Sequence, residues 1–149
     1  MPRHLPAIEV PSRLDQIVIL TDWFAQFRDS LLPDQLLLEA QIGLVEAFTN
    51  AVRHAHRGLD PQVPVRVEVQ IEPACFTLRV MDHGPPYDLE AALQARVELL
   101  ATQAVDRLER DEHWGLILLL QLKTQRGWQL EYRCEPTGVN VFELCHALA

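Results

Sequence analysis

The sequence predicts an α+β fold: a two-layer α/β sandwich in which helices cover one face of a mostly antiparallel sheet. One observation is the grouping of helix-like and strand-like segments, in the order (β)-α-α-β-β-α-α-β-β, which is typical of that architecture. The other is composition: 149 residues, 48% hydrophobic and 23% charged, are ordinary values for one soluble domain. We therefore expect residues 1–149 to form a single domain.

The first predicted elements are a short strand and a helix. Residues 7–10 suit a strand that Pro11 ends. Ser12, with Asp15 three residues later, has the pattern of a helix N-cap. The helix that follows is predicted to run to about Ser30, because apolar side chains recur along it at helical spacing.

The next predicted element is a long helix from Pro33-Asp34 to about His56, with Gly58 and Pro61 after it. At 100° per residue, one face is apolar and carries Leu37, Ala40, Leu44, Ala47, Phe48, Ala51 and Ala55. A narrow polar stripe lies opposite and carries Glu39, Glu46, Asn50, Arg53 and Arg57. On periodicity alone, this stripe is the solvated face of an amphipathic helix.

Two hairpins and two further helices complete the predicted fold, because strand-like alternation and turn residues recur in the second half. In order, these elements are strands over 65–71 and 76–80, a helix over 89–110, an apolar helix from Gly115 to about Lys123, and strands over 128–134 and 139–144.

Charge and residue usage exclude several classes of protein. A formal charge of −8 argues against direct nucleic-acid binding, which needs a basic face. The longest apolar run, Leu116 to Leu120, is too short to span a bilayer, and no signal peptide is visible. Lys123 is the only lysine, and no Gly-Lys-Ser/Thr triplet exists, which excludes a P-loop. The three cysteines are interpreted as reduced and buried, so we expect a cytoplasmic protein with no membrane partner.

Three short motifs carry candidate chemistry, and each also has a plain structural explanation. Glu46 and Asn50 are neighbours one helical turn apart, and a carboxylate beside a carboxamide suits Mg²⁺. Asp82 ends an apolar strand two residues before Gly84, where it can accept a hydrogen bond from an exocyclic amine, although Asp-x-Gly turns are common. Gly115 before a helix offers free backbone N–H groups to phosphate, although one glycine is weak support.

Taken together, these motifs resemble those of the GHKL ATPase superfamily. Glu46-Ala-Phe-Thr-Asn50-Ala-Val-Arg-His54-Ala resembles its N box, Asp82-His-Gly84 its G1 box, and Gly115-Leu116-Ile-Leu the end of its G2 box. The closest resemblance is to the anti-sigma-factor serine kinases of bacterial partner-switching systems, whose closing hairpin is similar to residues 138–141. The resemblance covers about residues 9–148.

The resemblance implies a Bergerat-type sandwich that binds ATP and Mg²⁺ between the helices and the sheet. Asn50 would bind Mg²⁺, and Asp82 would read the adenine amino group. Gly84 would let the adenine approach closely. The N–H groups of Gly115 and Leu116 would hold phosphates.

The resemblance also implies a catalytic residue and a lid. Glu46 would be the general base that draws the proton from a substrate serine or a water, and residues 89–113 would be the ATP lid. Asn140 stands near the base at a strand position that usually holds a threonine, and it can still hydrogen-bond. Two further departures are Pro86 in place of a G1 glycine and Glu112-His113 in place of a G2 glycine pair, where loss of glycine restricts the backbone.

Three functions are compatible with these residues. The first is an ATP-binding, anti-sigma-factor-like serine-protein kinase that phosphorylates an antagonist protein and sequesters a sigma factor; similar kinases are dimers, so a homodimer is one expectation. The second is a protein-interaction module of the same fold that has lost efficient turnover, with or without ATP. The third is a sensor-kinase-like or hydrolytic ATPase. A transition-metal site is disfavoured, because His54 and His56 diverge by about 200° on a helix.

Overall fold

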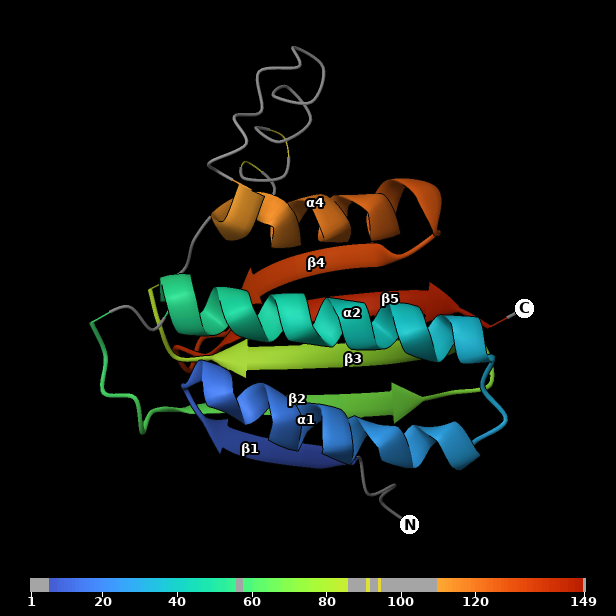
Figure 1. Cartoon of the computed structure of the whole chain (residues 1–149), viewed down its shortest axis with the longest axis horizontal. Coiled ribbons are helices and arrows are strands. Elements are labelled where there is room, and N and C mark those ends of the chain that lie inside the picture. Colours follow the sequence, from blue (N-terminus) through green and yellow to red (C-terminus); the bar gives the residue numbers. More distant parts are fainter. Residues whose placement is uncertain (1–5, 56–57, 86–90, 92–93, 95–109, 149) are drawn as a thin grey trace.

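Five strands form one open sheet in the order β1-β2-β3-β5-β4, and each neighbouring pair is antiparallel. In Figure 1 the helices α1, α2 and α4 lie over one face of this sheet. The computed structural model describes residues 6–55, 58–85, 91, 94 and 110–148. Within these residues, the predicted α+β sandwich is confirmed.

All five predicted strands are present, with ends that differ from the prediction by three residues at most. The elements along the chain are β1 (Ala7–Pro11), η1 (Leu14–Gln16), α1 (Ile17–Phe24), η2 (Ala25–Asp29), α2 (Asp34–Asn50), η3 (Ala51–Ala55), β2 (Pro64–Ile71), β3 (Cys75–Asp82), α4 (Arg110–Gln125), β4 (Gln129–Cys134) and β5 (Asn140–Ala147).

Two local hairpins, β2–β3 and β4–β5, are joined through the pairing of β3 with β5. In this pairing Leu78 lies opposite Leu144 in the middle of the sheet. The same register places Asp82, the last residue of β3, opposite Asn140, the first residue of β5. Two polar residues that are distant in the sequence therefore become neighbours at one end of the sheet.

The core lies between the sheet and α2. Alternating strand residues face the helices, among them Val67, Leu78 and Leu144, and each is 0% exposed. The predicted apolar face of α2 is buried against them; its described members are Leu37, Ala40, Leu44, Ala47, Phe48 and Ala51. A Cβ at Gly43 would lie only 2.5 Å from Cδ2 of Leu144, so glycine permits the close approach of α2 to β5.

The start of the first helix differs from the prediction. Ser12 is not the N-cap, because the first helical turn, η1, follows Arg13 and no side chain caps it. The Ser12 N–H instead donates to the carbonyl of Pro61 over 2.8 Å, which keeps Ser12 in line with β1. The region predicted as one helix is divided, since α1 tightens into the 3₁₀ turn η2.

The later helices also end and begin differently. Helix α2 is regular through Asn50 and then widens into the π-helical turn η3. Helix α4 begins at Arg110, five residues before the predicted start at Gly115. The charged residues before the apolar run belong to the same helix, because acidic residues favour the first turn of a helix. The helix predicted over 89–110 and the lid over 89–113 lie largely outside the described residues.

The three cysteines are free, as predicted. The prediction that they are buried is wrong. Cys134 is exposed on the edge strand β4, and Cys75 and Cys145 are half-buried. Their positions alternate with the helix-facing residues of their strands, so Cys75 and Cys145 lie on the face of the sheet that the helices leave open.

Candidate functional site

Three segments meet at one end of the sheet: the last turns of α2, the end of β3 and the start of β5. The first turn of α4 is drawn on the same side of the molecule (Figure 1, left side). The turn η3 that continues α2 also contacts β3. This end carries five of the predicted site residues, namely Glu46, Asn50, Asp82, Gly84 and Asn140. We refer to it as the Asp82 end of the sheet.

Asp82, Gly84 and Asn140 form one hydrogen-bonded cluster. Nδ2 of Asn140 donates to Oδ1 of Asp82 over 2.8 Å and to the carbonyl of Gly84 over 2.6 Å. The Gly84 N–H donates to the same Oδ1 over 3.1 Å. Asp82 is 4% exposed and Asn140 2%, and polar groups this buried need such partners. The cluster therefore joins residues of two strands and a loop.

Asn50 is the last residue of α2 and is 7% exposed. Its Nδ2 has no hydrogen-bond partner among the residues that the structure describes. A buried amide donor without a partner costs free energy, and such a group in a folded protein needs an explanation. A ligand at the Asp82 end would supply that partner.

Glu46 lies one turn before Asn50 and is half-buried. Burial raises the pKa of this carboxyl above its ordinary value, and the positive charge of Arg53 offsets part of the effect. A carboxyl with a raised pKa is a stronger base than an ordinary glutamate, and such groups are frequent at functional sites. Glu46 thus has the chemistry of a candidate base.

Gly115 and Leu116 lie in the second turn of α4, and the prediction that Gly115 opens the helix is wrong. In an α-helix, only the first four N–H groups lack an intrahelical acceptor. Counted from Arg110, Gly115 and Leu116 lie beyond these four groups. Phosphate binding by Gly115 and Leu116 stays a prediction, and it requires a local change in this helix start.

Glu39 is a buried residue that sequence reasoning missed. It was expected in the solvated stripe of α2, but it is 6% exposed. Its carboxylate accepts hydrogen bonds from Nε1 of Trp128 over 3.2 Å, and from Nε of Arg126 and Nε2 of Gln35 over 3.1 Å each. The turn between α4 and β4 covers this flank of α2, and periodicity within one helix carries no information about such a cover. The available signal was Trp128, whose indole N–H needs an acceptor when buried.

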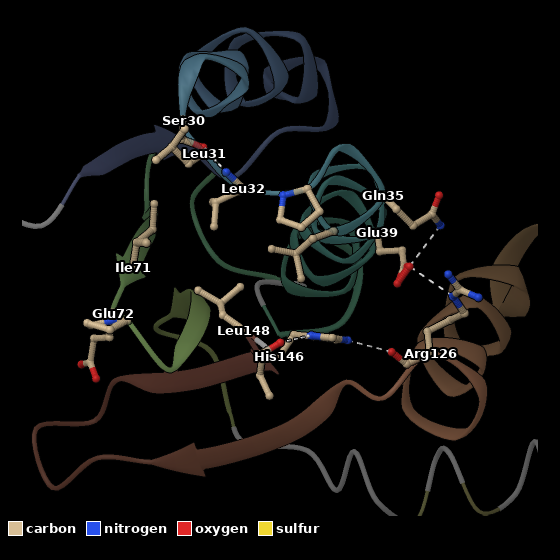
Figure 2. A pocket seen from close by; sticks show the side chains of 14 residues that line it. Ser30, Leu31, Leu32, Gln35, Glu39, Ile71, Glu72, Arg126, His146 and Leu148 are labelled. Carbon is tan, nitrogen blue, oxygen red and sulfur yellow. Dashed lines mark hydrogen bonds and ion pairs between the residues drawn. The ribbon is translucent and has the colours of Figure 1, made fainter.

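A cavity of about 720 Å³ lies at the other end of the sheet (Figure 2). It is bounded by the loop before α2, the β2–β3 turn, the α4–β4 turn and the end of β5. Its polar groups bond one another: Glu39 accepts from Arg126, and Nε2 of His146 lies 2.9 Å from the Arg126 carbonyl. None of the predicted site residues lines it. We therefore place the candidate site at the Asp82 end, where the unpaired amide of Asn50 and the Asp82 cluster lie, and not at this cavity.

Two further properties concern metal and membrane binding. Over the part of the chain that the structure describes, no group of three or more His, Cys, Asp or Glu side chains is placed to hold a metal ion. Within the same residues, no helix has the length and apolar character needed to cross a membrane.

Comparisons with known proteins show the family and the fold of this chain. A family model described as "Histidine kinase-like ATPase domain" matches residues 10–141. The chain is also similar to a solved structure, the SiaB-SiaC complex from Pseudomonas aeruginosa, with a TM-score of 0.59 and 14% sequence identity. The match covers 96% of this chain and 89% of that one. At this identity the likeness shows a shared fold. A comparison with curated proteins gives no match.

Proposed function

Because the chain belongs to the histidine kinase-like ATPase family, we propose that it is an ATP-dependent serine-protein kinase of the anti-sigma-factor type. ATP with Mg²⁺ would bind at the Asp82 end of the sheet, and the phosphate acceptor would be a serine of an antagonist protein. The observation that carries the proposal is the buried amide of Asn50, whose donor has no partner among the described residues.

The residues of the Asp82 end fit this ligand chemically. The amide oxygen of Asn50 is a hard oxygen ligand of the kind that Mg²⁺ prefers, and its unpaired Nδ2 suits a phosphate oxygen. Asp82 is an acceptor held by two donors, which suits the amino group of adenine. Bound Mg²⁺ would neutralise charge on the phosphates.

Glu46 would act as the general base. Its carboxylate would take the proton of the serine hydroxyl, and its raised pKa makes it a stronger base than an exposed glutamate. Glu46 and Asn50 are one helical turn apart, so the base and the metal ligand lie on the same side of α2. Residues 89–113 would form the lid, and residues 1–149 would act as one domain.

The proposed partners are an antagonist protein that is phosphorylated and a sigma factor that is sequestered. Support comes from the N-box resemblance at residues 46–55 and from the solved structure of similar fold, which is a complex of two proteins, SiaB and SiaC. A cytoplasmic homodimer is part of the same proposal.

Isothermal titration with Mg·ATP and Mg·ADP tests nucleotide binding directly. We expect the wild type to bind, Asn50→Ala to weaken the Mg²⁺-dependent part, and Asp82→Asn to reduce the preference for adenine. Gln121→Ala, an exposed substitution on α4, is the matched control and should bind like the wild type. Absence of binding by the wild type at millimolar nucleotide would contradict the proposal.

A second candidate is a module of the same fold that binds a nucleotide or a protein partner without turnover. The observation that favours it is the start of α4 at Arg110, which places Gly115 and Leu116 inside the helix. Phosphate transfer from labelled ATP to a serine of a co-purified antagonist separates the two candidates. Binding without transfer would favour the module.

A further inference from the structure

The cavity at the end of the sheet away from Asp82 has the size and the lining of a small-molecule site. Its volume of about 720 Å³ lies within the range of roughly 300–1,000 Å³ for pockets that hold such ligands, and these pockets are mostly apolar with a few fixed polar groups. The apolar part of the lining includes Leu32, Leu36, Ile71 and Leu148. Figure 2 shows Glu39, Arg126 and His146 together on the other side of the cavity, where they form one polar wall.

Most of the polar wall is already bonded within the protein. Glu39 is 6% exposed, and its two carboxylate oxygens accept hydrogen bonds from Trp128 and from Arg126. The two ring nitrogens of His146 lie 2.7 Å and 2.9 Å from the backbone carbonyls of Ala147 and Arg126. These contacts hold the wall in one geometry, which is what a binding site needs.

Arg126 can still meet a ligand. Its Nε donates to Glu39 over 3.1 Å, but the side chain is 49% exposed. The N–H groups at the end of the guanidinium are donors, and arginine has no acceptor. A ligand therefore has to present an acceptor to this part of the wall.

The charges around the cavity indicate an uncharged ligand. Within the wall, the negative charge of Glu39 balances the positive charge of Arg126 at 3.1 Å. Glu72 also lines the cavity, but its carboxylate points away from it in Figure 2. Because an unpaired charge is costly beside apolar groups, a ligand with a net charge would be penalised here.

Apolar side chains also stand at the rim of the cavity. Leu31 is 105% exposed and Ile71 is 40% exposed, although both line it. Removal of apolar surface from water is favourable in proportion to the area that is covered. A ligand with an apolar chain would cover this surface.

We propose that this cavity is a second ligand site, which binds an uncharged small molecule with an apolar chain and one carbonyl group. The chain would lie against the leucines and Ile71, and the carbonyl oxygen would accept a hydrogen bond from the guanidinium of Arg126. Fatty amides and esters have this chemistry. None of these residues belongs to the Asp82 end, so the inference does not rest on the proposed function.

Three probes of equal chain length test the head group: octanamide, octanoate and octylammonium, each titrated into the nitrogen-labelled chain and followed by two-dimensional NMR. Octanamide should shift the backbone signals of residues 30–36 and 146–148 in a saturable way. The two charged probes should bind at least about tenfold more weakly. Hexanamide, which is shorter by two methylene groups, should bind about tenfold more weakly than octanamide.

Two substitutions test the residues. Ile71→Asp brings a charge to the apolar part and should weaken octanamide about tenfold; Ile71→Thr is the second variant should the aspartate not fold, with circular dichroism as the folding check. The matched control is Val18→Asp, because Val18 is 63% exposed and does not line the cavity. It should bind octanamide like the wild type. Arg126→Met leaves the charge of Glu39 unbalanced, so this variant should prefer octylammonium to octanamide.

The same measurements can overturn the inference. It fails if octanamide does not bind at millimolar concentration, if the three head groups bind equally, or if the shifted signals lie at the Asp82 end. If no probe binds and Ile71→Asp lowers the oligomeric state in analytical ultracentrifugation, the cavity is a contact between copies of the chain and not a ligand site. Nucleotide binding plays no part in these outcomes, so the proposed function is tested separately.

Discussion

The indole Nε1 of Trp128 donates a hydrogen bond to Oε1 of Glu39 over 3.2 Å, and the two side chains are 2% and 6% exposed. The other carboxylate oxygen accepts bonds from Arg126 and Gln35. This single carboxylate thus ties the N-terminal half of α2 to the turn between α4 and β4. Burial alone would raise the pKa of Glu39, but the hydrogen bonds and the Arg126 charge outweigh burial and lower it.

Glu39→Gln should destabilise the fold by about 1–3 kcal/mol, because the amide cannot accept all three hydrogen bonds and turns a donor toward one of them. Urea unfolding at neutral pH measures the change. The control is Glu131→Gln on β4, an exposed position where the change should stay within about 0.5 kcal/mol. Equal effects of the two substitutions would show that the Glu39 network adds nothing to stability.

Stability should fall as the pH is lowered below about 4.5, the ordinary pKa of glutamate. For Glu143, burial would raise the pKa, but hydrogen bonds from Arg79 and Arg133 lower it; the pKa of Glu39 is also lowered. A carboxyl with a depressed folded-state pKa stabilises the native state above its unfolded pKa, and the contribution is lost as pH falls through the folded value. Midpoints of urea unfolding, measured from pH 7 to pH 3, test this prediction. In the double variant Glu39→Gln, Glu143→Gln, the midpoint should fall less steeply with pH than in the wild type.

Gly43→Ala should destabilise the protein by about 1 kcal/mol. Alanine favours a helix over glycine by about 1 kcal/mol, but the new methyl group would meet Leu144 at 2.5 Å, and overpacking of a core costs about 1–3 kcal/mol. In a Leu144→Ala background the clash is absent, so the same glycine substitution should become stabilising. Urea unfolding of the four proteins measures this coupling, and a stabilising effect in both backgrounds would contradict the close approach of α2 to β5.

Glu46→Gln should have opposite effects on stability and on the proposed activity. The pKa of Glu46 is raised chiefly by burial, so its charged form destabilises the folded state as pH rises through that pKa. The glutamine variant should therefore resist urea better than the wild type at pH 7 to 8. If Glu46 is the base, phosphate transfer should drop about 10² to 10⁴-fold while nucleotide binding is retained.

The pH profile gives a second measurement on the same variant. Wild-type transfer should rise with pH through the pKa of Glu46, since only the carboxylate accepts a proton, and this limb should be missing in the glutamine variant. Equal rates for the two proteins would rule out Glu46 as the base.

The sequence predicted the strands and the apolar face of α2 because these patterns are local. Alternation around Val67 and helical spacing around Leu44 are both set by which side faces the core. The burial of Glu39 depends on contacts with Arg126 and Trp128, which are distant in the sequence, and it leaves no local signal in the helix. The contact between Asp82 and Asn140 was predictable only in part. Each residue stands at one end of a strand, which is a local pattern, but only the pairing of β3 with β5 makes the two residues partners.

The strand order has a consequence for how the protein folds. Asp82 belongs to the β2–β3 hairpin, Asn140 to the β4–β5 hairpin and Asn50 to α2. Each hairpin joins strands that are close in the sequence, whereas Asn140 and Asp82 are 58 residues apart, and such distant pairings carry a larger loop-closure cost. We expect the hairpins to form early and the candidate site to appear last, so that ligand binding during refolding reports the completed native state and not its parts.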